Sequence, residues 1–167
     1  MKKLTLYTII GILFVLTTGT LAHFVYEWSG SNPIVGYFFP VNESSWEHMK
    51  LCFFPMLAYF FFMRGILKTE YPCVSSGLLA GILLGTFLIP VIFYTYSGIL
   101  GQNYLVLDIA TFAVSVILSY WAAYRLSLSC HLARYTLLLK GLVAALAICF
   151  FVFTDNPPTI ALFQPPI

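Results

Sequence analysis

Charged residues are scarce in this 167-residue chain. Asp, Glu, Lys and Arg together make up 8% of it, against about a quarter of a typical soluble domain. Hydrophobic residues make up 60% and aromatic residues 18%. A soluble fold of this length cannot cover so much apolar surface, so the composition indicates a membrane protein in contact with the lipid bilayer. The sequence shows no basic patch interleaved with aromatic residues, which argues against a nucleic-acid partner.

The common cysteine and histidine motifs are also missing. The four cysteines form no CxxC and no CxxCH, which argues against zinc-ribbon, redox and c-type haem sites. We therefore expect each cysteine to be a small apolar residue of a helix. No HExxH spacing occurs, so any metal site must draw its ligands from separate segments.

The chain does contain five long apolar segments. Each exceeds the roughly 20 residues that an α-helix needs to cross a bilayer. They cover residues 4–28, 45–67, 71–96, 104–124 and 132–153. The sequence therefore predicts an all-α fold, an integral membrane bundle of five transmembrane helices. These helices form one domain, 1–167, with an outer loop over 29–44.

The basic residues indicate how the bundle is oriented. Seven of the eight lie at one set of segment ends: Lys2, Lys3, Arg64, Lys68, Arg125, Arg134 and Lys140. Loops rich in Lys and Arg face the cytoplasm. We therefore predict that the N-terminus lies inside and the C-terminus outside.

Five of the six acidic residues and two of the three histidines lie at the opposite ends of the same segments. They are Glu27, Glu43, Glu47, Asp108 and Asp155, with His23 and His48. Five helices leave these side chains few places to be except near one another. The pattern predicts a single outward-facing polar site.

Ordinary helix chemistry explains some of these residues. Glu43, Glu47 and Asp108 lie at helix starts, where a carboxylate complements the helix dipole. Ser44 and Glu47 fit a capping box, and Glu47 can also pair with Lys50 one turn later. Glu27 and Asp155 instead lie at helix ends, where a negative charge is disfavoured.

The unexplained residues suggest a metal site. Two imidazoles and a carboxylate, with one position open for water, form the ligand set of catalytic zinc sites. We predict that His23, Glu27, His48 and Asp155 bind a divalent metal such as zinc. We also predict a general base among Glu47, Glu43 and Asp108. Such a site would hydrolyse a lipid-like substrate at the outer membrane surface.

Two other functional classes remain open. The first is an ion or solute transporter, although no ionisable residue lies near a helix midpoint, where coupled transporters place one. The second is a non-catalytic structural or partner subunit. Gly77, Gly81 and Gly85 form a stripe along one helix face, which favours close packing within the bundle or, alternatively, contact with a partner helix or a second copy.

The outer segments also resemble a known family. The stretches HFVYEWSGSNP at 23–33 and FPVNESSWEH at 39–48, with the later Asn156-Pro157-Pro158, are similar to a family of small multi-pass bacterial membrane proteins of unknown function. The resemblance implies a shared fold and a shared outer site in the bacterial cytoplasmic membrane. It implies no particular reaction.

Overall fold

The protein is an all-helical bundle. The computed structural model describes residues 1–166, and helices are the regular elements in that range. The long helices are α1 (Lys2–Trp28), α3 (Ser45–Leu67), α4 (Val74–Leu100), α5 (Leu105–Ser129) and α6 (Thr136–Asp155). The short elements are α2 (Pro33–Gly36), η1 (Ala133–Tyr135) and η2 (Ala161–Phe163). Five helical spans are long and apolar enough to cross a membrane, so the predicted fold class is confirmed.

Two helices extend further than the sequence pattern indicates. α4 continues to Leu100, where Gly101 ends it in the left-handed conformation with φ 77°, a conformation that glycine adopts without strain. α5 continues to Ser129, past the polar residues that end the predicted span. Ser127 Oγ donates to Ala123 O at 2.7 Å, so this hydroxyl is satisfied within the helix and does not end it.

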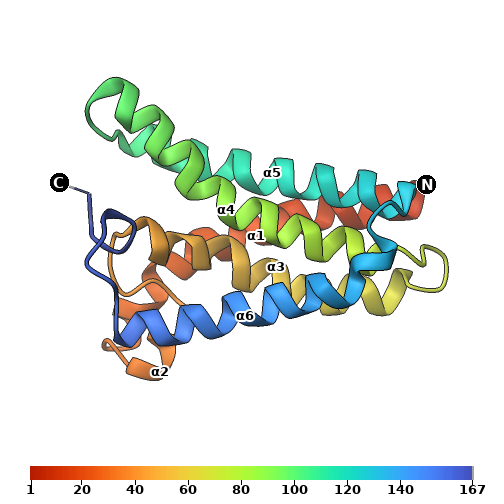
Figure 1. The fold of residues 1–167 in the computed structure, drawn as a ribbon, viewed down its shortest axis with the longest axis horizontal. Helices are drawn as coiled ribbons and strands as arrows, with labels where there is room; N and C mark the ends of the chain where they lie inside the picture. Colours follow the sequence, from red (N-terminus) through yellow and green to blue (C-terminus); the bar gives the residue numbers. More distant parts are fainter. Residues whose placement is uncertain (167) are drawn as a thin grey trace.

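The glycine stripe packs inside the bundle, where α4 and α5 form an antiparallel hairpin (Figure 1). A Cβ added to Gly81 would lie 2.7 Å from Ser119 O, and one added to Gly85 would lie 2.6 Å from Ser119 Cβ. Only glycine permits such a close approach of the two backbones. A partner helix on this face would have to displace α5.

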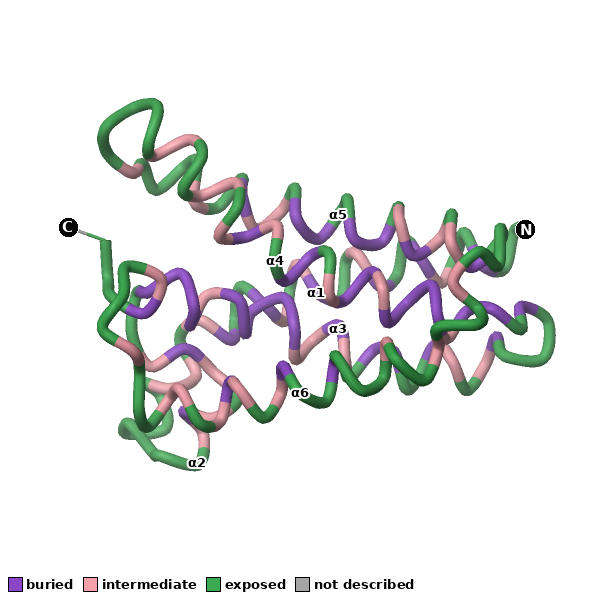
Figure 2. The backbone as a smooth tube through the Cα atoms, viewed as in Figure 1, coloured by how far each residue is buried: buried purple, intermediate pink, exposed green. Residues whose placement is uncertain are grey.

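The outer surface of the bundle is apolar. Figure 2 shows buried residues on the inward faces of the helices and exposed residues on the outward faces. The exposed side chains include Phe61, Phe87, Trp121, Leu137 and Ile148. Exposing so many apolar side chains to water would be unfavourable, so this surface is expected to face lipid. The arrangement is that of a multi-pass membrane protein.

Two cysteines form a disulfide, which corrects the expectation that all four are unpaired apolar residues. Cys73 precedes α4 and Cys130 follows α5; their Cα atoms lie 5.3 Å apart and their sulfurs are bonded. The sequence did not reveal the pair because 57 positions separate the two residues and only the hairpin brings them together. Cys52 and Cys149 are free thiols within helices.

The first and last residues that the structure describes, 1 and 166, lie at opposite ends of the bundle (Figure 1). We call the end near the N-terminus the basic end, because it carries most of the Lys and Arg residues. The end near the C-terminus is the acidic end; it carries His23, Glu27, Glu43, Glu47, His48, Asp108 and Asp155. The side of the membrane on which each end lies stays a prediction. The disulfide lies at the basic end, although disulfides persist mainly in oxidising compartments and the charge pattern assigns this end to the cytoplasm.

Candidate metal centre

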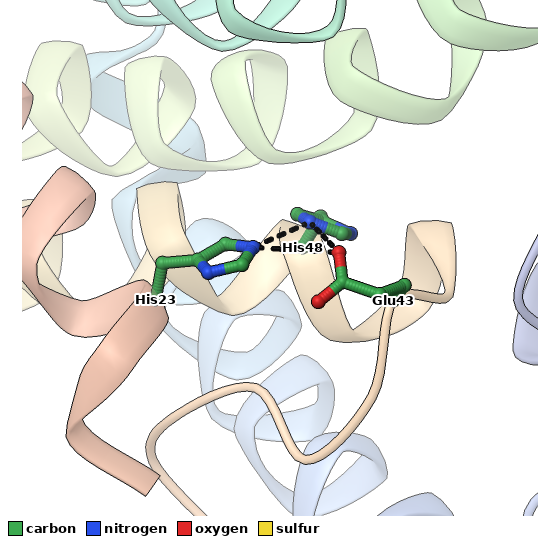
Figure 3. A group of neighbouring side chains, drawn as sticks. All are labelled: His23, Glu43 and His48. Carbon is green, nitrogen blue, oxygen red and sulfur yellow. Dashed lines mark hydrogen bonds and ion pairs between the residues drawn. The ribbon is translucent and has the colours of Figure 1, made fainter. Parts of the chain in front are cut away.

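Three side chains converge at the acidic end (Figure 3). His23 comes from the last turns of α1, His48 from the first turn of α3, and Glu43 from the loop between these helices. The two Nε2 atoms of the histidines lie 3.3 Å apart. Glu43 Oε2 lies 3.4 Å from each of them. Among residues 1–166, these form the one group of at least three His, Cys, Asp or Glu with ligand atoms close enough to share a metal ion.

The three ligand atoms form a nearly equilateral triangle. Zinc binds imidazole nitrogen and carboxylate oxygen at about 2.0–2.2 Å in a tetrahedral arrangement, which places neighbouring ligand atoms about 3.3–3.5 Å apart. The observed edges of 3.3, 3.4 and 3.4 Å match one face of such a tetrahedron. Three protein ligands leave the fourth position free for water or substrate, as in catalytic zinc sites.

A backbone carbonyl orients the imidazole of His48. His48 Nδ1 lies 3.0 Å from Ser44 O, and a carbonyl oxygen can only accept a hydrogen bond. The ring proton therefore lies on Nδ1, and neutral His48 presents the lone pair of Nε2 to the triangle. A hydrogen bond of this kind on the distal nitrogen is usual for metal-binding histidines.

The charge state of Glu43 also suits a metal ligand. When His48 is protonated, its Nε2–H donates to Glu43 and lowers the pKa of this carboxyl group below its ordinary value, against the opposing effect of partial burial. The carboxylate is therefore ionised at neutral pH. The side chains of His23, His48 and Glu43 are 32%, 28% and 64% exposed, so an ion can reach the triangle from outside the protein.

Glu47, a predicted general base, is buried and engaged elsewhere. Its Oε2 accepts a hydrogen bond from Lys50 Nζ at 2.7 Å and another from Val41 N at 3.0 Å. One of the two hydrogen bonds of the predicted capping box forms, because Ser44 Oγ accepts from Glu47 N at 3.3 Å. The reciprocal bond does not form, because Ser44 N donates to the side chain of Asn42 at 2.9 Å and not to Glu47.

Three further predicted site residues lie outside the triangle. Asp155 accepts a hydrogen bond from the hydroxyl of Tyr37 at 2.8 Å, which stabilises its charge at the end of α6. Asp108 accepts from Tyr96 and, at 3.2 Å, from Asn103. Glu27 is exposed at the end of α1. The structure thus brings together His23 and His48 of the predicted ligands, and adds Glu43 in place of Glu27 and Asp155.

The place of Glu43 in the triangle has a weak signal in the sequence. His23 and Glu27 share a helix face, and this periodicity favours Glu27 as the neighbouring ligand. Glu43 lies in a loop, where no periodicity predicts its direction. The sequence indicates that Glu43 lies near His48 only through its position, two residues before the first turn of α3.

The chain belongs to the family described as "Family of unknown function (DUF6512)", whose match covers residues 1–167. This supports the resemblance of the chain to a family of unknown function. No curated protein and no solved structure matches the chain significantly.

Proposed function

We propose that this member of a family of unknown function binds one divalent metal ion, with zinc as the best fit, through His23, Glu43 and His48. The observation that carries the proposal is the triangle of ligand atoms with edges of 3.3–3.4 Å. Its size suits a tetrahedral ion with two nitrogen ligands and one oxygen ligand. The hydrogen bond from His48 Nδ1 to Ser44 O supports it, because it leaves Nε2 free to bind.

We propose further that the site hydrolyses a lipid-like substrate. A zinc ion with an open position lowers the pKa of a bound water to about 7 and so supplies hydroxide at neutral pH. His23 lies five residues before the end of α1, roughly 7 Å along the helix axis. This depth corresponds to the boundary between lipid headgroups and hydrocarbon for a helix that spans the bilayer.

The surroundings of His23 support an amphiphilic substrate. The ring of Phe24 lies 5.2 Å from the ring of His23 and stacks on Trp28 at 5.8 Å. Phe24 and Trp28 are 44% and 69% exposed, as expected for aromatic residues at a membrane interface. A lipid with its acyl chains in the bilayer would present its ester or phosphate group at the depth of the triangle.

Metal analysis of the detergent-purified protein tests the binding proposal. We expect about one zinc ion per wild-type chain after reconstitution with Zn²⁺, loss of this ion in His23→Ala and His48→Ala, and weakened binding in Glu43→Ala, which keeps both histidines. Glu27→Ala is the matched control, because this carboxylate lies one turn from His23 and outside the triangle. Wild-type protein without stoichiometric metal would refute the proposal.

Turnover is tested separately in lipid nanodiscs. We expect metal-dependent release of a soluble product from a panel of glycerophospholipids and polyprenyl phosphates, and no release by His48→Ala. A protein that binds zinc and turns over none of these lipids would refute the hydrolytic part and leave the binding part intact. Zinc uptake by sealed proteoliposomes would then favour transport.

A further inference from the structure

A buried lysine lies on α3, two residues after His48. The side chain of Lys50 is 0% exposed, and that of its partner Glu47 is 3% exposed. Lys50 Nζ donates three hydrogen bonds, each to a different part of the chain. The acceptors are Glu47 Oε2 at 2.7 Å, Gly36 O at 2.9 Å and Thr154 Oγ1 at 2.7 Å. Lys50 therefore connects α3 to the end of α2 and to the last turn of α6.

Glu47 extends this connection to the segment that carries Glu43. Its carboxylate accepts from Val41 N, and its backbone N–H donates to Ser44 Oγ. These two bonds hold the chain on either side of Glu43. Of the three triangle residues, Glu43 is the one outside a helix, so its position depends on the loop.

Further contacts make the same segment rigid. Gly36 packs so closely that an added Cβ would lie 2.7 Å from the side chain of Val41. Ser44 N donates to Asn42 Oδ1 at 2.9 Å, and Ser44 O accepts from the imidazole of His48. One network of hydrogen bonds thus runs from Lys50 through Glu47 and Ser44 to a histidine of the triangle.

A buried ion pair needs a reason, because burying two charges often costs more than their mutual attraction returns. An apolar pair could fill the same space between α3 and the loop. It could not accept a hydrogen bond from Val41 N and hold Gly36 O at the same time. The pair therefore gives the loop a specific position, which apolar packing would not define.

We propose that Lys50 and Glu47 are positioning residues of the metal centre, which hold Glu43 against His23 and His48. This inference rests on the proposed metal binding. Neither residue binds the ion. Each acts through Glu43, so removing either should have the same effect on the metal as removing Glu43.

A double-mutant cycle tests this dependence. The dissociation constant for Zn²⁺ is measured in detergent by competition with a chromophoric chelator, for wild type, Lys50→Met, Glu43→Ala and the double variant. We expect Lys50→Met to weaken binding by about 10- to 100-fold, as is typical when a residue that orients a ligand is removed. We expect the double variant to bind no more weakly than Glu43→Ala, because Lys50 has nothing left to position.

The visible spectrum of bound Co²⁺ adds a readout that general destabilisation would not change. We expect the spectrum of Lys50→Met to lose the four-coordinate bands of wild type and to resemble that of Glu43→Ala. Tyr59→Phe is the matched control, since it removes another hydrogen bond between helices, a partly buried one from Tyr59 to Tyr7 O at 2.8 Å, at a different level of α3. We expect it to keep the wild-type spectrum and affinity.

The outcomes separate the two proposals. If wild type binds no zinc, the metal centre itself is refuted. If wild type binds zinc and Lys50→Met keeps the wild-type affinity and spectrum, the positioning role is refuted; additive losses in the double variant refute it as well. If Lys50→Met does not fold, the apolar double variant Lys50→Met/Glu47→Leu decides: it leaves no buried unpaired charge and removes the acceptor of Val41 N. Weaker zinc binding by this folded double variant supports the role, and wild-type binding overturns it.

Discussion

His48 Nε2 faces His23 Nε2 at 3.3 Å, although the two residues lie on different helices. The hydrogen bond to Ser44 O keeps the proton of neutral His48 on Nδ1. The facing nitrogen of His48 therefore carries a lone pair. Two imidazole nitrogens at this distance either share a proton or share a cation. The ionised carboxylate of Glu43, 3.4 Å from both, stabilises a positive charge between them, whether it is carried by a proton or by a metal ion.

Zinc binding should depend steeply on pH. Protons compete with the metal for imidazole nitrogens, which ordinarily titrate near pH 6.5. We expect the affinity to fall as the pH is lowered through the range in which imidazoles titrate, approaching about 100-fold per pH unit once both histidines are protonated, because two protons are bound for each zinc released. Protonation of Glu43 causes no further loss of zinc affinity between pH 5 and 8, because the pKa of Glu43 is lowered. Zinc titrations between pH 5 and 8 measure the slope, and a flat profile would contradict ligation by two histidines.

The metal centre should discriminate between cations. Ca²⁺ and Mg²⁺ prefer six or more oxygen ligands, whereas His23 and His48 supply two nitrogens. We expect Zn²⁺ and Co²⁺ at micromolar concentration to raise the unfolding temperature, and millimolar Mg²⁺ or Ca²⁺ to have no effect. Thermal unfolding in detergent measures this shift. Stabilisation by Mg²⁺ that survives in His48→Ala would indicate a different site.

The α4–α5 contact should be intolerant of added volume. We expect Gly81→Ala to lower the free energy of unfolding by about 1–3 kcal/mol, because the new methyl group would lie 2.7 Å from Ser119 O and 2.9 Å from Ala123 Cβ. Gly98→Ala in the same helix is the control, since nothing lies within 4 Å of its Cβ position, and it should be neutral or slightly stabilising. Denaturant titration in mixed micelles measures the difference. Equal stability of the two variants would contradict this packing.

The disulfide offers a test of membrane orientation. The charge pattern places the basic end in the cytoplasm, where thiols are kept reduced. We therefore expect Cys73 and Cys130 to be thiols in growing cells and to form their bridge after extraction into air. Alkylation of acid-quenched cells followed by mass spectrometry measures the redox state of the two cysteines. The variant Cys52→Ser/Cys149→Ser is used so that every alkylated thiol is Cys73 or Cys130. A bridge already formed in growing cells would place the basic end on the oxidising side and reverse the predicted orientation.

The five helices follow from the sequence because hydrophobic length is a local property. A run of apolar residues long enough to cross a bilayer is helical wherever it lies, since the backbone must satisfy its own hydrogen bonds in lipid. The Ser44 cap at the start of α3 is local for the same reason. The ends of α4 and α5 are less predictable, because serine hydroxyls such as that of Ser127 can bond within the helix and extend it.

The sequence by itself determined the helical membrane character of this protein and the gathering of two histidines and five carboxylates at one end. Only the tertiary structure decided which of them meet. Glu43 reaches His23 and His48 because a loop folds back on the bundle, whereas Glu47 turns to Lys50 and Asp155 to Tyr37. The disulfide between Cys73 and Cys130 is likewise a product of the α4–α5 hairpin. Composition and periodicity act along one segment, whereas these contacts join segments whose relative positions depend on packing.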